Sequence, residues 1–283
     1  MNPALTRAEI IAAEAEDIPT LQEVNWKVLK TISDNGKANG APLEKLISRD
    51  QALTARILRA ANSTLIDFPK PVSSLKNAIN LLGARRLRSL ALAASIDGVV
   101  RSRSLKNRQM WEHSLAVGLA ASSLAEVCGY EDPETAFTCG LMHDLGKVVL
   151  DRGVTAEYQR VLDLVYNEHR SFLDAETEII GFDHAEIGRL VARKWNLPPL
   201  VEEVAGYHHD PAAAPLDPRL SAIVSAADAL CVQRGIGPSK RPDLDLYTLD
   251  AFLMLEIRHE TFETLAAQLE DRFRVTKRMF GVG

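Results

Sequence analysis

The stretch LMHDLGK, residues 141–147, sets a histidine and an aspartate side by side among apolar residues. Apolar flanks predict that the segment faces a core, where an ionised aspartate is costly unless a positive partner meets it. A metal ion is one such partner. Adjacent residues on a helix point about 100° apart, so His143 and Asp144 could hold one ion while the second Asp144 oxygen bridges to another. A buried, hydrogen-bonded His–Asp pair is the alternative.

Lys147 closes this stretch, four residues after His143 and on the same face of the expected helix. An ammonium group one turn from a metal is well placed to meet a phosphate oxygen. The alternative is a lysine in the last turn of its helix, where its charge offsets the helix dipole. Asp144 and Lys147 are therefore the candidate catalytic residues.

More histidines and a second aspartate could complete a metal centre, because imidazole and carboxylate are the usual ligands of zinc, iron and manganese. Asp228 lies in a small, apolar helical stretch, where a carboxylate needs a metal or a cationic partner unless it faces solvent. Singly, each histidine can be explained as a core, helix-start or helix-end residue. Together, one centre explains them all. The candidate metal ligands are His113, His143, Asp144, His184, His208, His209 and Asp228.

The two remaining histidines are of a different kind. His169 and His259 sit among charged residues, so we expect them to be solvated and without a role. The predicted cofactor is one or two divalent metal ions. Histidine and carboxylate suit iron, manganese, zinc and nickel alike, so the ligand types leave the metal open.

Helical periodicity runs through most of the chain. Leucine, alanine and isoleucine recur at three- and four-residue spacing, and alternating β-branched runs are scarce. The pattern predicts an all-α protein whose helices are separated by short breaks with Pro, Gly or Asn. The expected helices of the second half cover residues 111–127, 133–150, 156–169, 173–181, 184–195, 199–207, 220–234 and 247 to the end. Residues 1–16 are expected to form an amphipathic, acidic helix.

Composition narrows the class of protein. The chain has 283 residues, of which 46% are hydrophobic, and a net charge of −5 from 33 basic and 38 acidic residues. The acidic balance and the lack of a basic recognition helix argue against a nucleic-acid partner. No apolar stretch is long enough to span a membrane. Three scattered cysteines without a CxxC pair suit a reducing compartment, so we expect a cytoplasmic protein.

The polar stretch 101–109 carries four basic residues and little apolar material. It can be a boundary between two subdomains, or one exposed turn of a continuous helix. We take it as a boundary, which divides the chain into an N-terminal helical subdomain, residues 1–105, and a larger metal-binding helical subdomain, residues 106–283.

The order of His113, the His143–Asp144 pair and Asp228 resembles the HD superfamily of metal-dependent phosphohydrolases. The additional His184, His208 and His209 resemble members with two metals, such as the HD-GYP phosphodiesterases. The first half resembles the HDOD domain, the HD-related output domain of bacterial signalling proteins. The motifs that carry this likeness are IPTL (18–21), ISRDQALT (47–54), LRAANS (58–63) and PVSSLKNAINLLG (71–83).

The resemblance implies an all-helical, regulatory protein of bacterial signal transduction. It also implies that His113, His143, Asp144 and Asp228 hold a first ion, that Asp144 bridges, and that His184 with His208 or His209 holds a second. Many HDOD proteins have lost such ligands, whereas this chain keeps them. It lacks the Gly-Tyr-Pro motif of the cyclic-di-GMP enzymes, since DPAAA (210–214) follows His209.

Two functions follow from these expectations. The leading one is a signalling module that contacts partner proteins, with metal or a phosphorylated, nucleotide-type ligand as a possible input, and with self-association as one form of assembly. The alternative is a metal-dependent phosphohydrolase, a phosphodiesterase or nucleotide hydrolase, in which Lys147 and the metal centre stabilise charge on a phosphoryl group.

Overall fold

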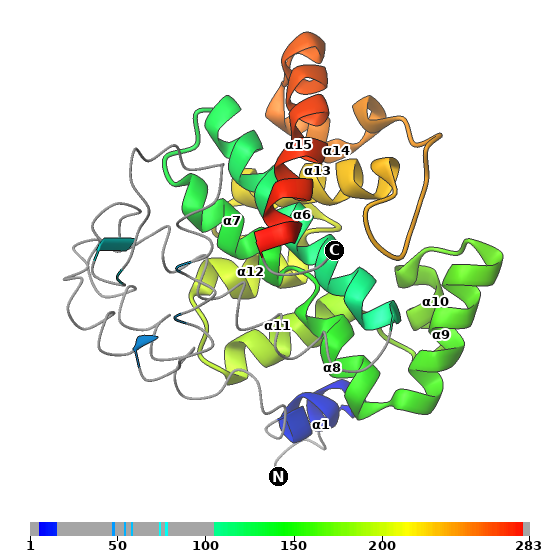
Figure 1. Ribbon diagram of the computed structural model, residues 1–283. Coiled ribbons are helices and arrows are strands. Elements are labelled where there is room, and N and C mark those ends of the chain that lie inside the picture. Colours follow the sequence, from blue (N-terminus) through cyan, green and yellow to red (C-terminus); the bar gives the residue numbers. More distant parts are fainter. Residues whose placement is uncertain are drawn as a thin grey trace. The chain divides into compact units, whose positions relative to one another are not determined.

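The computed structural model describes residues 6–15 and 105–279, together with residues 47, 48, 54, 58, 74, 77 and 78. Across these residues the regular elements are helices and no strand occurs, so the prediction of an all-α protein is confirmed (Figure 1). None of these helices is long and apolar enough to cross a membrane. The elements are α1 (Arg7–Glu14), α6 (Leu105–Val127), α7 (Pro133–Met142), α8 (Leu145–Gly153), α9 (Thr155–Glu168), α10 (Phe172–Ile179), α11 (His184–Lys194), α12 (Pro199–Tyr207), η2 (Pro211–Ala213), α13 (Pro218–Arg234), η3 (Leu246–Thr248), α14 (Asp250–Leu255) and α15 (His259–Met279).

The chain divides into two compact units, one with residues 1–18 and 108–265, the other with residues 19–107 and 266–283. The short helix α1 packs on α8 and α11, and its Ala8, Ile11 and Ala12 enter a core shared with α9 and α10. The division at residue 105 stays a prediction. The motifs of the first half lie outside the described residues, apart from the single positions given above.

Local sequence signals set the starts of the helices that carry the site. An aspartate or serine precedes four of the helices around the site, and its side chain accepts a hydrogen bond from a backbone N–H of the first turn. Pro at the first helical position of α7 and α13 reinforces the start, because the missing N–H would have no partner there. The capping residues are Asp132 for α7, Ser171 for α10, Asp183 for α11 and Asp217 for α13.

One expected helix is interrupted at the His143–Asp144 pair. The prediction of a single helix over residues 133–150 is wrong, since α7 ends at Met142 and α8 begins at Leu145. Asp144 has φ −93° and ψ 18°, outside helical values, and the Lys147 N–H bonds the Asp144 carbonyl across a tight turn. Both side chains of the pair therefore lie at a bend instead of along one helix.

A glycine explains why α8 leaves the direction of α7. A Cβ on Gly146 would lie 1.9 Å from the carbonyl oxygen of His184, so only glycine allows α8 to approach the start of α11 this closely. Gly118 and Gly140 likewise allow α6 and α7 to approach closely, since a Cβ on Gly140 would lie 3.0 Å from the Gly118 Cα. These contacts bring the starts and ends of separate helices together around one region.

The expected C-terminal helix is also broken. Instead of one helix from residue 247, the chain forms η3, α14 and α15, with Glu256 in the left-handed region at φ 50°. The turn lets α15 fold back so that Phe262 packs edge-on against Phe252, with ring centroids 4.8 Å apart. Local helix propensity continues across the break, so the burial of these two aromatic rings is the better explanation for it. Residues 105–109 of the polar stretch 101–109 form the start of α6, so this part of the stretch is helical.

Candidate metal centre

Side chains from five regions of the chain converge on one place: α6, the α7–α8 junction, the start of α11, the end of α12, and α13. Most of them are buried, and His209 is exposed. All the ligands expected from sequence lie there. Three overlapping sets each have one ligand atom per residue within 4.8 Å of the others. The sets are His113, His143 and Asp228; His143, Asp144 and His208; and His184, His208 and His209.

His113, His143 and Asp228 make one side of the centre. The Nε2 atom of His113 lies 2.9 Å from Asp228 Oδ1, and that of His143 lies 4.0 Å from the same oxygen. His113 is on α6, His143 directly follows α7 and Asp228 is on α13, so three helices meet here. The two imidazoles are buried, and Asp228 keeps a small exposed fraction.

Asp144 lies between the two sides of the centre. Its Oδ2 is 3.3 Å from His143 Nε2 and 2.7 Å from Lys147 Nζ. Its Oδ1 faces the other way, 3.3 Å from His184 Nε2 and 3.9 Å from His208 Nε2. The carboxylate of Asp144 thus faces both histidine groups. The hypothesis that Asp144 bridges two metal ions requires this geometry.

The ring orientations are fixed by hydrogen bonds on the side away from the centre. His113 Nδ1 lies 2.9 Å from the Ile236 carbonyl, and His143 Nδ1 lies 2.7 Å from the Gly140 carbonyl. Since a carbonyl only accepts, each Nδ1 carries a proton and donates, which turns each Nε2 toward the centre. Metal-binding histidines are held in this way.

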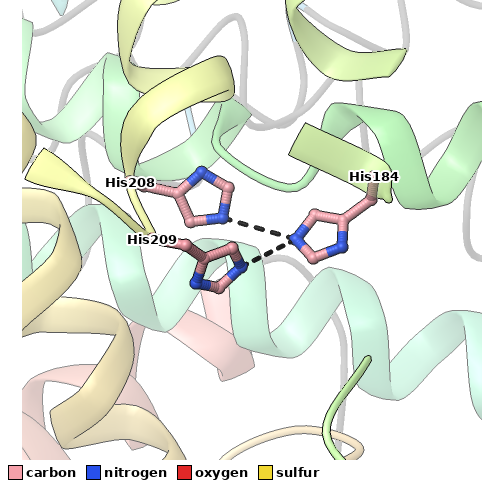
Figure 2. A group of neighbouring side chains, drawn as sticks. All are labelled: His184, His208 and His209. Carbon is pink, nitrogen blue, oxygen red and sulfur yellow. Dashed lines mark hydrogen bonds between the residues drawn. The ribbon is translucent and has the colours of Figure 1, made fainter. Parts of the chain in front are cut away.

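In the second histidine group, which consists of His184, His208 and His209, a hydrogen bond to a backbone carbonyl fixes the tautomer of His208. His208 Nδ1 donates to the Val204 carbonyl at 3.0 Å, and burial together with the nearby His209 lowers the pKa of His208, which keeps it neutral. Figure 2 shows His184 Nε2 facing Nε2 of both neighbours, at 3.4 Å from His208 and 3.0 Å from His209. Because His208 Nδ1 carries the proton of this neutral ring, His208 Nε2 can only accept a hydrogen bond or bind a cation.

The donor set fits a divalent metal. Among the described residues, His143 Nε2 and Asp144 Oδ1 are buried polar atoms without a hydrogen-bond partner, and both point into the centre. Leaving two such groups without a partner costs about 1–3 kcal/mol each, which a metal–ligand bond would remove. Imidazole nitrogens with carboxylate oxygens suit iron, manganese, zinc or nickel.

Neighbouring charges keep both aspartates ionised. Burial by itself would raise the pKa of Asp144, but the adjacent His143 and Lys147 outweigh burial and hold this pKa well below its ordinary value. Burial also acts to raise the pKa of Asp228, and the hydrogen bond and charge of His113 overcome it and lower the pKa. Ionised carboxylates are the form that binds metal.

Sequence reasoning missed Glu176, which supports His184. Glu176 on α10 is fully buried, and its Oε2 accepts from the backbone N–H of His184 at 2.8 Å and from Nδ1 of the same residue at 2.6 Å. The Tyr158 hydroxyl lies 3.4 Å from Oε1. A signal was present: Glu176 falls in the apolar stripe of its helix, four residues after Phe172 and next to Ala175.

The other residues singled out from sequence have clear positions. Lys147 is in the first turn of α8, so the alternative of a lysine offsetting the end of its helix is wrong, and its Nζ also lies 4.2 Å above the ring of Phe172. His169 is exposed at the end of α9, in the left-handed conformation. His259 is exposed too, and stacks on Tyr247 at 4.6 Å. Neither touches the centre.

The chain matches a known protein family over most of its length. The sequence profile of the HDOD domain matches residues 18–211. The chain belongs to the HDOD family. A crystal structure of an HDOD domain protein of unknown function from Geobacter sulfurreducens is 26% identical, with a TM-score of 0.82 over 98% of both chains. The match ends before Asp228, so that ligand lies beyond the HDOD profile.

Two further similarities are informative about context. A Marinobacter aquaeolei VT8 structure, provisionally named a signal transduction protein, is 19% identical, with a TM-score of 0.76 over 93% of this chain and 59% of that one, and shows the shared fold. A ribonuclease Y of Lactobacillus gasseri is 25% identical over 93% of this chain. The chain spans 40% of the length of this and of another curated relative that it matches.

Proposed function

We propose that the chain is a regulatory HDOD protein of signal transduction whose His/Asp centre binds one or two divalent metal ions. The observation that carries the proposal is Asp144, whose two oxygens face two separate histidine groups. Membership of the HDOD family supports the regulatory part. In this proposal the metal centre and a phosphorylated, nucleotide-type ligand are inputs, and partner proteins receive the output.

The roles of the residues divide between the two sides of the centre. His113, His143 and Asp228 would hold a first ion, and His184, His208 and His209 a second, with Asp144 between them. Glu176 holds His184 in place by accepting two hydrogen bonds from it. Element-resolved mass spectrometry on protein purified without chelators tests this, and less than about 0.2 equivalents of any divalent metal would refute it.

Metal-dependent hydrolysis of a phosphate ester is the second candidate, and the position of Lys147 favours it. Divalent ions in this centre would supply Lewis-acid chemistry, polarising a phosphoryl oxygen and making water more acidic. Lys147 Nζ is held at 2.7 Å from Asp144, at the edge of the centre, where it would meet charge developing on a phosphoryl oxygen. The similarity of the chain to a ribonuclease Y also supports hydrolysis of a phosphodiester.

A hydrolysis assay separates the two candidates. The metal-loaded chain is incubated with bis(p-nitrophenyl) phosphate, mononucleotides and cyclic nucleotides, beside the Asp144→Asn variant, which keeps the side-chain volume. Turnover by the parent that the variant lacks would establish the hydrolase. Metal-loaded protein without turnover on any of these would leave the regulatory proposal and remove the hydrolytic one.

A further inference from the structure

A cavity of about 600 Å³ opens on the metal centre. Four of its lining residues belong to the centre or its edge: His113, Lys147, His209 and Asp228. Its walls come from α9, α10 and α13 and include the apolar side chains Val165, Phe172, Leu173 and Val232. A volume of this size is typical of pockets for small organic ligands.

Cationic residues outnumber carboxylates along the lining of this pocket. Lys147, Arg170, Lys240 and Arg241 line it. Lys147 is buried and paired with Asp144, Arg170 is paired with Glu178, and Lys240 and Arg241 are exposed. Among the described residues that line the pocket, Asp228 is the only carboxylate, and its Oδ1 lies 2.9 Å from His113 Nε2. A cationic lining with apolar walls suits an anionic ligand that also carries an apolar body.

The loop that carries Lys240 and Arg241 is held firmly to α13. The Arg241 N–H donates to the Val232 carbonyl at 3.0 Å, and the Gln233 side chain donates to the Leu244 carbonyl at 2.8 Å. The stem of Lys240 lies against Gly235, where a Cβ would come within 2.9 Å of it. Both cations are thus presented from a defined place.

The same loop holds one of the candidate metal ligands. Nδ1 of His113 donates to the Ile236 carbonyl at 2.9 Å, and a Cβ on Gly237 would lie 2.7 Å from the His113 Cβ. The Ile236 N–H in turn donates to the Cys231 carbonyl. A ligand that contacts Lys240 and Arg241 therefore acts on a segment in direct contact with His113.

We propose that this pocket binds a phosphate ester of mononucleotide size, with its phosphate toward Lys147 and the metal centre, its body along the apolar walls, and its outer polar groups on Lys240 and Arg241. The proposal rests on the regulatory function above and names its ligand class. A volume of about 600 Å³ fits one nucleotide, whereas an RNA strand would need a longer groove.

The experiment measures binding and metal content separately. Isothermal titration of the metal-loaded full chain uses GMP, AMP, guanosine and a 12-nucleotide RNA. The test variant is Lys240→Ala/Arg241→Ala. The control variant, Arg193→Ala/Arg274→Ala, removes the same charge from two exposed arginines that lie outside the pocket lining and form surface ion pairs.

We expect a mononucleotide to bind the parent and the control alike, and the test variant at least about tenfold more weakly, the effect of one lost charge-assisted hydrogen bond. Metal content should be the same in all three. Three outcomes would overturn the proposal: no mononucleotide binding by metal-loaded parent, equal binding by the test variant, or guanosine or RNA binding as tightly as GMP. A parent without metal would instead overturn the function proposed above, while a loss of GMP binding confined to the test variant would still uphold the pocket.

Discussion

Replacing Glu176 tests whether His184 is a metal ligand. Glu176→Ala removes the acceptor of two hydrogen bonds from His184, to its backbone N–H and its Nδ1. Glu176→Gln can keep both bonds, because a single amide oxygen in the place of Oε2 can accept from both donors, and it removes only the negative charge. The two variants therefore separate orientation of the ring from its electrostatic support.

The magnitude follows from these contacts. Loss of a carboxylate that orients a metal-binding histidine typically costs 10- to 100-fold in metal affinity, about 1.4–2.7 kcal/mol. We expect Glu176→Ala to reach this range and Glu176→Gln to lose less. The alanine variant also leaves two donors of His184 without a partner in a buried place, at about 1–3 kcal/mol each, so it should unfold at a lower temperature.

Competition with a chromophoric chelator measures the metal dissociation constant, and circular dichroism verifies that each variant is folded. Glu178→Gln is the matched control, two residues along the same helix, where the side chain is exposed and pairs with Arg170. It should leave metal affinity unchanged. Parental affinity in folded Glu176→Ala would refute the assignment of His184 as a ligand held by Glu176.

Three further predictions concern the same unit. Gly146→Ala should lower the thermal midpoint sharply and weaken metal binding, since its Cβ would lie 1.9 Å from a backbone oxygen. Gly153→Ala on the same helix is the control, because its Cβ would meet only a side-chain methyl at 3.1 Å. Similar midpoints for the two variants would contradict the close approach of α8 and α11. Chelation should lower the midpoint by calorimetry, because an ion at 100 times its Kd contributes about 2.7 kcal/mol, and an unchanged midpoint would speak against an occupied centre. Burial and the Asp217 hydrogen bond raise the pKa of Tyr130, and burial raises that of Tyr166 to about 12. Because phenols in the unfolded chain ionise near pH 10, stability should hold below pH 10 and fall as pH rises above it; Tyr130→Phe should flatten that fall in denaturant titrations, and an equal slope would count against it.

Local sequence signals predict most of the described helices, because periodicity and capping residues act within a few positions. The helix expected over residues 199–207 has those bounds in the structure. The two failures, at residues 143–144 and 256, are places where distant contacts override local preference. In the first, Gly146 lets α8 turn onto α11, and in the second the packing of Phe252 on Phe262 bends the chain.

Sequence by itself determined the helical class and supplied the candidate ligands, since residue types and spacing are written in the chain and an ionised aspartate among apolar neighbours needs a positive partner. Only the tertiary structure decided that Asp144 faces both histidine groups, that Glu176 orients His184, and that the loop carrying Lys240 and Arg241 borders the centre. These relations join residues that are eight positions apart for Glu176 and His184 and 123 apart for His113 and Ile236. They depend on how helices pack, and side-chain packing between distant segments leaves no periodic trace in a single sequence.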